Sequence, residues 1–178
     1  MELFRAIEKR HSYRGPYRDR AVPRTDLEKM LRAAIQAPSG YNEQTTSFVA
    51  VDDQETIARI SEILEQPRLT SAPAIVVVCM DLSARERREL FFGVEDYSAA
   101  CENLLLAATA LGYAGVWIDG ALRRADRARR LGELLGVPDS FEVRVVVPIG
   151  VPEESWDQKE KRSFSERAFF NSFGSRQQ

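Results

Sequence analysis

Four side chains that suit an anion stand within five residues near the start of the chain. These residues are Arg10, His11, Ser12 and Arg14. A planar guanidinium matches two phosphate oxygens at once, and a hydroxyl or a backbone amide can complete such a cradle. The cluster precedes Gly15-Pro16, which cannot prolong a helix. The alternative is a solvated basic helix end paired with Glu8, which is the commoner case for a cluster taken alone.

The composition favours a single globular domain with a real core. Of the 178 residues, 44% are hydrophobic and 29% are charged, which argues against disorder. The formal net charge of -2 gives no general attraction to nucleic acid or to an anionic membrane. We therefore expect a small anionic ligand, with no nucleic-acid partner and no membrane partner.

The number and spacing of cysteine and histidine residues limit the metal sites that are possible and indicate the redox compartment. Cys79 and Cys101 are isolated, and His11 is the single histidine, so no set of zinc ligands is present and we expect no metal site. The first residues lack the apolar core of a signal peptide, and no apolar run approaches a membrane span. The expectation is a soluble, cytoplasmic protein with two reduced core cysteines.

Hydrophobic periodicity predicts alternating helices and strands. Thr25 and Glu28 form a capping box before a helix with one apolar face. The continuous apolar run at 74–79 predicts a strand that is covered on both faces. The remaining patterns predict a helix carrying Leu3, Phe4 and Ile7, strands at 47–51, 115–118 and 142–149, and helices at 56–64, 96–111 and 125–135.

Two of these segments shape the expected architecture. The alanine-rich pattern at 96–111 is the longest, so we expect a central, most buried helix, which Gly112 ends. Residues 153–178 are polar and charged but too aromatic for a purely disordered end, so we expect them to pack on a second subunit. With no internal repeat or linker, residues 1–178 are predicted to form one domain.

A second motif, residues 37–44, follows the predicted capped helix. Its sequence is Ala37-Pro38-Ser39-Gly40-Tyr41-Asn42-Glu43-Gln44. Together with the cluster at 10–14, it resembles the nitroreductase family of FMN-dependent oxidoreductases. The similarity continues through 96–108, 112–120, 147–150 and 162–166, and thus spans nearly the whole chain. Five motifs in register make this resemblance specific.

The resemblance implies an α+β fold, a three-layer sandwich in which a mainly antiparallel mixed sheet is flanked by helices. It also implies a domain-swapped homodimer whose C-terminal segments, residues 153–178, each embrace the partner. Two FMN molecules would lie at the dimer interface, each touched by both chains.

The resemblance also assigns the cofactor contacts. The FMN phosphate and ribityl chain would bind Arg10, Ser12 and Arg14, with His11 close to the flavin. The partner chain would line the ring with Pro38, Ser39, Gly40 and Asn42, where Gly40 replaces the serine of many members.

Three further assignments complete the implied site. Arg68 matches a basic position at the pyrimidine end of the flavin, where a cation favours the reduced form, although an exposed loop arginine is an equal alternative. The turn of Ile118, Asp119 and Gly120 would offer a backbone amide to flavin N5. Near the end, family members carry a Lys-x-Arg whose two side chains reach the FMN phosphate. Here Arg162 fits this motif, but Glu160 stands at the lysine position. Lys161 or Lys159 would have to replace that lysine.

Residues 81–95 form a short segment where larger relatives hold helices that roof the active site, so the pocket should be open. Tyr41, Phe91 and Phe92 are candidates for stacking on an aromatic ligand, with core packing as the alternative for at least one phenylalanine.

The implied activity is a two-step, ping-pong exchange. NAD(P)H would pass hydride to flavin N5 and leave, and a nitroaromatic, quinone or similar small planar acceptor would then be reduced. The alternatives are a specialised member that dehydrogenates its substrate or cleaves the flavin, and a non-catalytic flavin-binding protein. The physiological acceptor and the choice between NADH and NADPH stay open.

Overall fold

The computed structural model describes residues 1–87 and 89–175. Its helices are α1 (Leu3–Lys9), α2 (Arg24–Ile35), α3 (Gln54–Leu64), α4 (Ala84–Arg87), α5 (Gly93–Ala110), α6 (Arg127–Leu135) and α7 (Phe164–Arg167). Its strands are β1 (Thr46–Val51), β2 (Ala74–Asp81), β3 (Ala114–Gly115) and β4 (Phe141–Gly150), and two 3-10 turns are η1 (Gly40–Asn42) and η2 (Pro67–Ser71).

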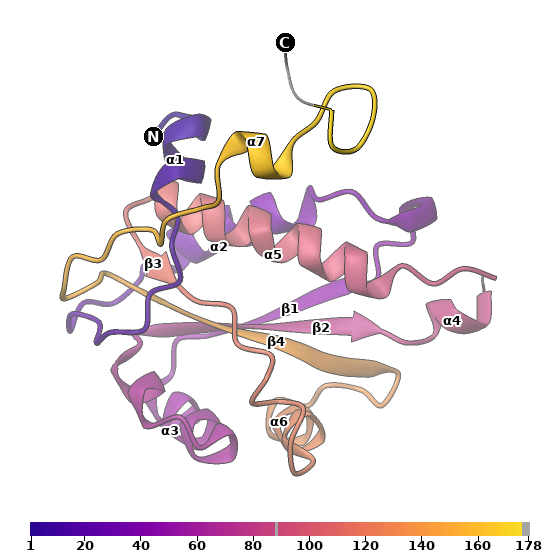
Figure 1. Cartoon of the computed structure of the whole chain (residues 1–178). Coiled ribbons are helices and arrows are strands. Elements are labelled where there is room, and N and C mark those ends of the chain that lie inside the picture. Colours follow the sequence, from indigo (N-terminus) through magenta and orange to yellow (C-terminus); the bar gives the residue numbers. More distant parts are fainter. Residues whose placement is uncertain (88, 176–178) are drawn as a thin grey trace.

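The elements form three layers around one sheet, as Figure 1 shows. The strand order is β1-β2-β4-β3, and each of these neighbouring pairs is antiparallel. Helices α2 and α5 cover one face and helices α3 and α6 the other. A single parallel bridge, from Ser12 to Gly115, adds the mixed character among the described residues. The predicted α+β three-layer sandwich is confirmed.

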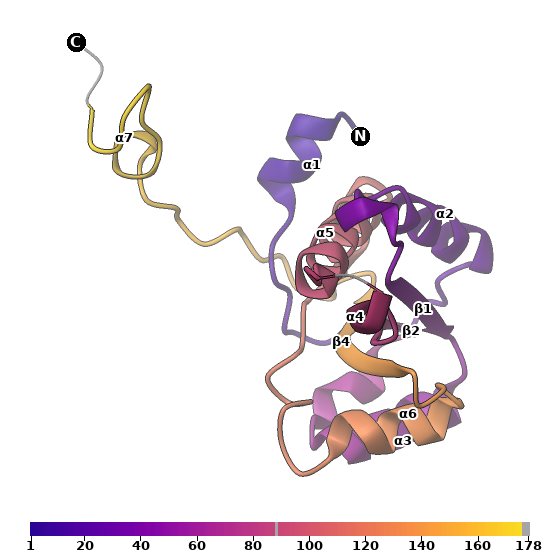
Figure 2. The ribbon, with the colours of Figure 1, turned by 90° about the vertical axis from the view of Figure 1, so that its right-hand side faces the viewer.

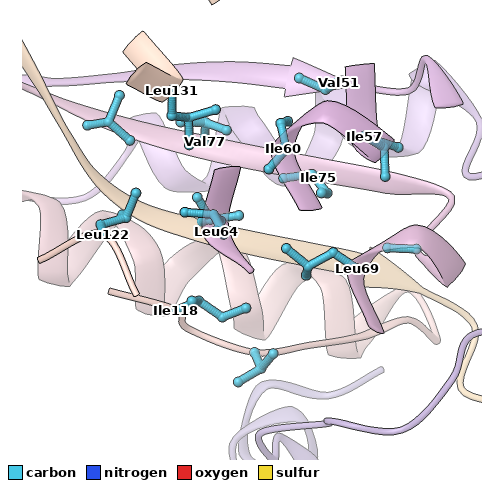
Figure 3. Close-up of a cluster of buried hydrophobic side chains, with 14 of the residues drawn as sticks. Val51, Ile57, Ile60, Leu64, Leu69, Ile75, Val77, Ile118, Leu122 and Leu131 are labelled. Carbon is cyan, nitrogen blue, oxygen red and sulfur yellow. The ribbon is translucent and has the colours of Figure 1, made fainter. Parts of the chain in front are cut away.

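Strand β2 is the centre of the core and is buried on both faces, as its continuous apolar run predicts. Ile75 and Val77 belong to the cluster under α3 and α6, which Figure 3 shows. Val76 and Val78 belong to the cluster under α2 and α5. Each such side chain contributes roughly 1.5–3 kcal/mol when it is fully buried. Two helical layers are therefore needed to exclude water from both faces of this strand.

Helix α5 is the longest of the described helices and runs across the sheet (Figure 1). Small residues such as Ala100 and Ala108 are buried along it, so α2 and the sheet approach closely. Gly112 follows with φ +89°, a backbone conformation that suits glycine, and Tyr113 N donates to Ala108 O at 2.9 Å. The expected central helix and its glycine end are confirmed.

The predicted capping box at the start of α2 is wrong. The helix begins at Arg24 with Pro23 at the N-cap, so Thr25 lies inside the first turn and no side chain caps the backbone there. Glu28 instead accepts a hydrogen bond from Arg32 Nη2 at 2.6 Å, one turn further along the helix.

Two other predicted boundaries differ for backbone reasons. The helix expected at 125–135 starts only at Arg127, because Ala125 and Asp126 have φ of 49° and 54°, which a right-handed helix excludes. The strand expected at 115–118 shortens to β3 plus one bridge from Ile118 to Val146, because the chain between them leaves the edge of β4.

The two cysteines are buried and unpaired, as expected. Burial raises the pKa of the Cys79 thiol to about 11 and that of the Cys101 thiol to about 12, where Glu102 adds to the effect. Because the thiolate is the reactive form, we predict that neither cysteine of the native protein reacts with Ellman's reagent at about pH 8. Both should react once guanidinium chloride unfolds the chain, and rapid labelling of the native protein would contradict the burial.

Both ends of the described chain leave apolar side chains uncovered. Helix α1 buries Ala6 alone, whereas the predicted apolar residues Leu3, Phe4 and Ile7 are 60%, 79% and 45% exposed. After β4 the chain leaves the body and carries α7 at a distance from it (Figure 2). On this segment the exposed aromatic side chains include Phe164, Phe170 and Phe173.

No helix in the described ranges is long and apolar enough to cross a bilayer.

Candidate functional site

The loop at residues 10–14 is held between β3 and the chain that follows β4. Tyr13 N donates to Gly115 O at 3.1 Å, and the Tyr13 ring is completely buried. The Tyr13 hydroxyl accepts from the backbone N–H groups of Glu153 and Glu154 at 3.2 and 3.3 Å. The buried tyrosine thus brings the start of the C-terminal segment against the basic loop.

A pocket of about 430 Å³ lies between this loop and residues 156–161, and we call it the basic pocket. Four cationic side chains and one carboxylate lie in its lining, so it attracts anions. Its lining residues are Arg10, His11, Ser12, Arg14, Trp156, Asp157, Gln158, Lys159 and Lys161.

Arg10 is the least exposed of the four cationic residues that line this pocket. Its side chain is 19% exposed, and its Nε lies 3.4 Å from Glu102 Oε1 on α5. Gln158 Nε2 donates to the Arg10 carbonyl at 2.6 Å, which ties the C-terminal segment to the end of α1. The backbone of Arg10 is therefore fixed by Gln158 and its guanidinium is oriented by Glu102, which suits a phosphate ligand.

His11 offers a ring nitrogen without a partner. Its Nδ1 lies 2.9 Å from the Lys9 carbonyl, which can only accept, so Nδ1 carries the proton. Its Nε2 is buried, and no other described group satisfies it. A neutral ring can accept there from a ligand hydroxyl, and a protonated ring can donate to an anion.

Glu160 stands where the family motif has a lysine, but the two lysines on either side of it supply ammonium groups to this pocket. Lys159 and Lys161, between which the sequence left a choice, both line the basic pocket. Arg162 is exposed and is absent from the described lining. Arg68 is also exposed, donates to Gln66 Oε1 at 2.9 Å, and is likewise outside that lining.

The loop that carries Pro38, Ser39, Gly40 and Asn42 lies apart from the basic pocket. It connects α2 to β1, and Ser39 Oγ accepts from Gln44 N at 3.0 Å. Pro38 and Ser39 line a different cavity of about 130 Å³. Within one described chain, the two predicted halves of the site are therefore not brought together.

The aromatic candidates separate into a pair and a core residue. The rings of Tyr41 and Phe92 lie 5.7 Å apart between centroids. A Cβ atom at Gly40 would lie 2.4 Å from Cδ2 of Phe92, so the missing serine side chain makes room for that ring. Phe91 packs against the core cluster under α2 and α5, with the Arg85 guanidinium 4.9 Å from its ring centroid. These contacts support the alternative of core packing for Phe91.

The turn at residues 118–120 is held by the sheet. Ile118 N donates to Val146 O at 3.0 Å, and Val146 N donates to Ile118 O at 2.9 Å. Asp119 Oδ2 accepts from Arg123 Nη2 at 2.7 Å, so its side chain already has a partner. Gly120 is exposed with open space where a Cβ would lie. The turn can present backbone to a ligand.

Part of the basic pocket could not be predicted from the sequence. Trp156 belongs to the segment that the sequence predicts to pack on a second subunit. Its ring centroid instead lies 5.3 Å from that of Tyr13 in the same chain. No sequence motif predicts that Asp157 and Gln158 line this pocket. What places them is the antiparallel bridge between Tyr17 and Pro152, which returns the chain to the basic loop.

Comparison with known proteins places this chain in a family. The family model described as "Nitroreductase family" matches residues 7–66 and 61–151. A protein of Archaeoglobus fulgidus, named as an NADH dehydrogenase/NAD(P)H nitroreductase, is 40% identical over 157 residues, which cover 88% of each chain.

Solved structures agree with that match. A protein of Parabacteroides distasonis with the same description has a TM-score of 0.83 at 28% identity, over 96% of this chain and 98% of that one. An FMN-dependent nitroreductase of Clostridium difficile R20291 has a TM-score of 0.81 at 29% identity, over 94% and 98%. The chain belongs to the nitroreductase family, as its motifs indicated.

Proposed function

We propose that this protein is an FMN-dependent oxidoreductase that takes hydride from NAD(P)H and reduces a small planar acceptor, such as a nitroaromatic or a quinone. Family membership and the names of the relatives support the cofactor, the electron donor and the class of enzyme. The observation that carries the proposal in this chain is the basic pocket. Its loop pairs through Ser12 with Gly115 on β3, the edge strand that leads to the turn at residues 118–120.

The residues present fit FMN. A terminal phosphate needs several converging donors, and Arg10, Arg14, Lys159 and Lys161 surround one space. The ribityl chain carries hydroxyls, and the unpartnered Nε2 of His11 can accept from one of them. We infer that Ser12 completes this set and that Lys159 and Lys161 together take the place of the family lysine missing at Glu160.

Bound FMN supplies N5, the atom that accepts and releases hydride. The part of this chain is to orient the ring and to donate a backbone hydrogen bond from the turn of Asp119 and Gly120. The two hydrogen bonds between Ile118 and Val146 hold that turn against β4. The Asp119 carboxylate accepts a hydrogen bond from Arg123, so this side chain is not proposed to transfer a proton.

We further propose a homodimer of single-domain chains, each spanning residues 1–178. The uncovered apolar side chains of α1 and α7 need a surface, and a second copy provides one. A second copy also resolves the separation of the two halves, because its loop at 38–42 can face the first chain's basic pocket. In this arrangement residues 153–178 embrace the partner, and we infer that Arg162 reaches a flavin phosphate.

The Tyr41–Phe92 pair is proposed as the acceptor-stacking surface. It lies beside Gly40 at the start of α5, and among residues 82–87 and 89–92, which the structure describes before that helix, the single-turn α4 is the one helix. A short segment above the flavin would leave room for different planar acceptors. Initial-rate patterns should therefore be ping-pong, since donor and acceptor would use the same face of the flavin in turn.

The test is a purified protein and its bound flavin. We expect a yellow protein whose flavin absorbance bleaches rapidly when NADH or NADPH is mixed in a stopped-flow experiment without oxygen. A quinone or nitroaromatic should then restore the colour. Colourless protein that takes up no added FMN would contradict the proposal, and bound flavin that bleaches only slowly would favour a non-catalytic flavin carrier.

A further inference from the structure

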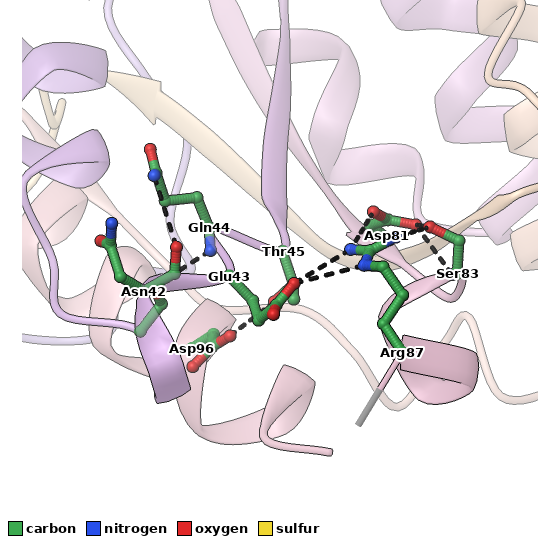
Figure 4. A network of polar contacts seen from close by, with 9 residues as sticks. Asn42, Glu43, Gln44, Thr45, Asp81, Ser83, Arg87 and Asp96 are labelled. Atoms are coloured by element: carbon green, nitrogen blue, oxygen red, sulfur yellow. Dashed lines mark hydrogen bonds and ion pairs between the residues drawn. The ribbon is translucent and has the colours of Figure 1, made fainter. Parts of the chain in front are cut away.

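A buried carboxylate joins the central helix to the loop that follows α2, as Figure 4 shows. Asp96 is 4% exposed and lies in the first turn of α5. Its Oδ1 accepts from Gly40 N at 2.8 Å, and its Oδ2 accepts from the Thr45 hydroxyl at 2.7 Å. One side chain therefore holds both ends of the segment at 40–45.

That segment has a strained backbone. Tyr41, Asn42 and Gln44 have φ of 53°, 56° and 51°, in the left-handed region that residues with a Cβ rarely adopt. Such conformations persist where surrounding contacts determine them, and they concentrate at ligand sites. Something outside the segment must therefore hold it in place.

The packing beneath the loop does not supply this restraint. Pro38, Ser39 and Asp96 line the 130 Å³ cavity, so apolar packing on that side of the loop is incomplete. The outer side is tied by an ion pair of Glu43 with Arg87, at 3.2 Å, whose arginine is about half exposed. Hydrogen bonds to a buried carboxylate are the stronger restraint, because ionised acceptors bind donors more tightly and solvent does not compete.

Phe92 acts together with Asp96 from one helical turn earlier. Asp96 N donates to Phe92 O at 2.8 Å, and the Phe92 ring occupies the space beside Gly40. The start of α5 thus contacts Gly40 through both a ring and a carboxylate. The favourable field at a helix N-terminus supports the buried negative charge.

We propose that Asp96 is a positioning residue for the flavin ring. By binding Gly40 and Thr45, it holds Pro38, Ser39 and Asn42 in the conformation that lines the ring. This inference rests on the proposed function, in which that loop faces the flavin of the partner chain. It adds a residue on the central helix that acts on the ring and not on the phosphate.

The experiment compares FMN with riboflavin, which lacks the phosphate, using apoprotein and quenching of flavin fluorescence. Asp96→Ala removes both acceptors and should raise the dissociation constants of FMN and riboflavin by the same factor, about tenfold or more. Asp96→Asn should restore most of the affinity, because its oxygen accepts from Gly40 and its amide donates to the Thr45 hydroxyl. Glu95→Ala, an exposed acidic position in the same helical turn, is the matched control.

The outcomes separate this inference from the proposed function. Wild-type protein that binds no FMN would refute the function itself. Wild-type binding with Asp96→Ala equal to Glu95→Ala, or with a loss confined to FMN, would overturn the role of Asp96. If Asp96→Ala does not fold by circular dichroism, Thr45→Val decides, since it removes one of the two bonds. A smaller rise in both constants supports the inference, and unchanged constants overturn it.

Discussion

Removal of residues 153–178 is expected to eliminate FMN retention and the homodimer together. This segment contributes Lys159 and Lys161 to the basic pocket and the exposed aromatic side chains of the α7 region. Each charge-assisted contact is worth about 1.5–3 kcal/mol, so loss of both lysines should weaken FMN binding by about a hundredfold or more. Gel filtration with absorbance at the flavin band, together with sedimentation velocity, measures both losses.

A shorter truncation separates the two effects. Removing residues 164–178 deletes Phe164 and the aromatic residues after it but keeps the contacts of Trp156 and Gln158 with the basic loop. We expect this variant to dissociate more readily while its dimers still hold FMN. A protein cut before Glu153 that remains dimeric and yellow would show that the C-terminal segment serves neither role.

Arg10→Ala is expected to weaken FMN binding by about 1.5–3 kcal/mol, roughly a ten- to hundredfold rise in the dissociation constant. The reason is the enclosed position of the guanidinium, which Glu102 orients at the pocket wall while Gln158 binds the Arg10 carbonyl. Riboflavin affinity should hardly change, because the lost contact is to the phosphate. Arg59→Ala, an exposed arginine on α3 across the sheet, serves as the control.

Mixed dimers extend this prediction to the shared site. In a dimer of one Arg10→Ala chain and one Asp96→Ala chain, one flavin would meet an intact basic pocket and an intact partner loop. Titration of co-expressed, doubly tagged heterodimers should then show one tight site per dimer, although both parent homodimers bind weakly. Two weakened sites and no tight one would mean that each chain's loop serves its own flavin.

The core could be predicted from local patterns, whereas several boundaries could not. The apolar run at 74–79 required cover on both faces, and the structure provides it through two helical layers. The start of α6 depends on left-handed conformations at Ala125 and Asp126. Alanine gives no signal of such a conformation, and aspartate adopts it more often than most residues but does not require it. The extent of β3 depends on its pairing with the end of β4, which no short window of sequence contains.

The candidate site divides in the same way. Arg10, His11 and Ser12 are adjacent in sequence, so a short stretch of the chain is enough to indicate their chemistry. Gln158 joins them because the chain folds back over more than a hundred residues, and Asp96 is one carboxylate at the edge of an apolar helix. Residues recruited over such distances can be assigned to a site only through the topology of the fold.

The small buried surface of α1 has a consequence for the working enzyme. A helix of seven residues that buries only Ala6 is too short to be stable alone, yet Arg10 directly follows its last residue. If the partner chain orders this helix, assembly and cofactor loading become one linked equilibrium, in which each stabilises the other. The affinity for FMN then depends on enzyme concentration, and dilute enzyme should lose activity by shedding its flavin and its partner in the same step.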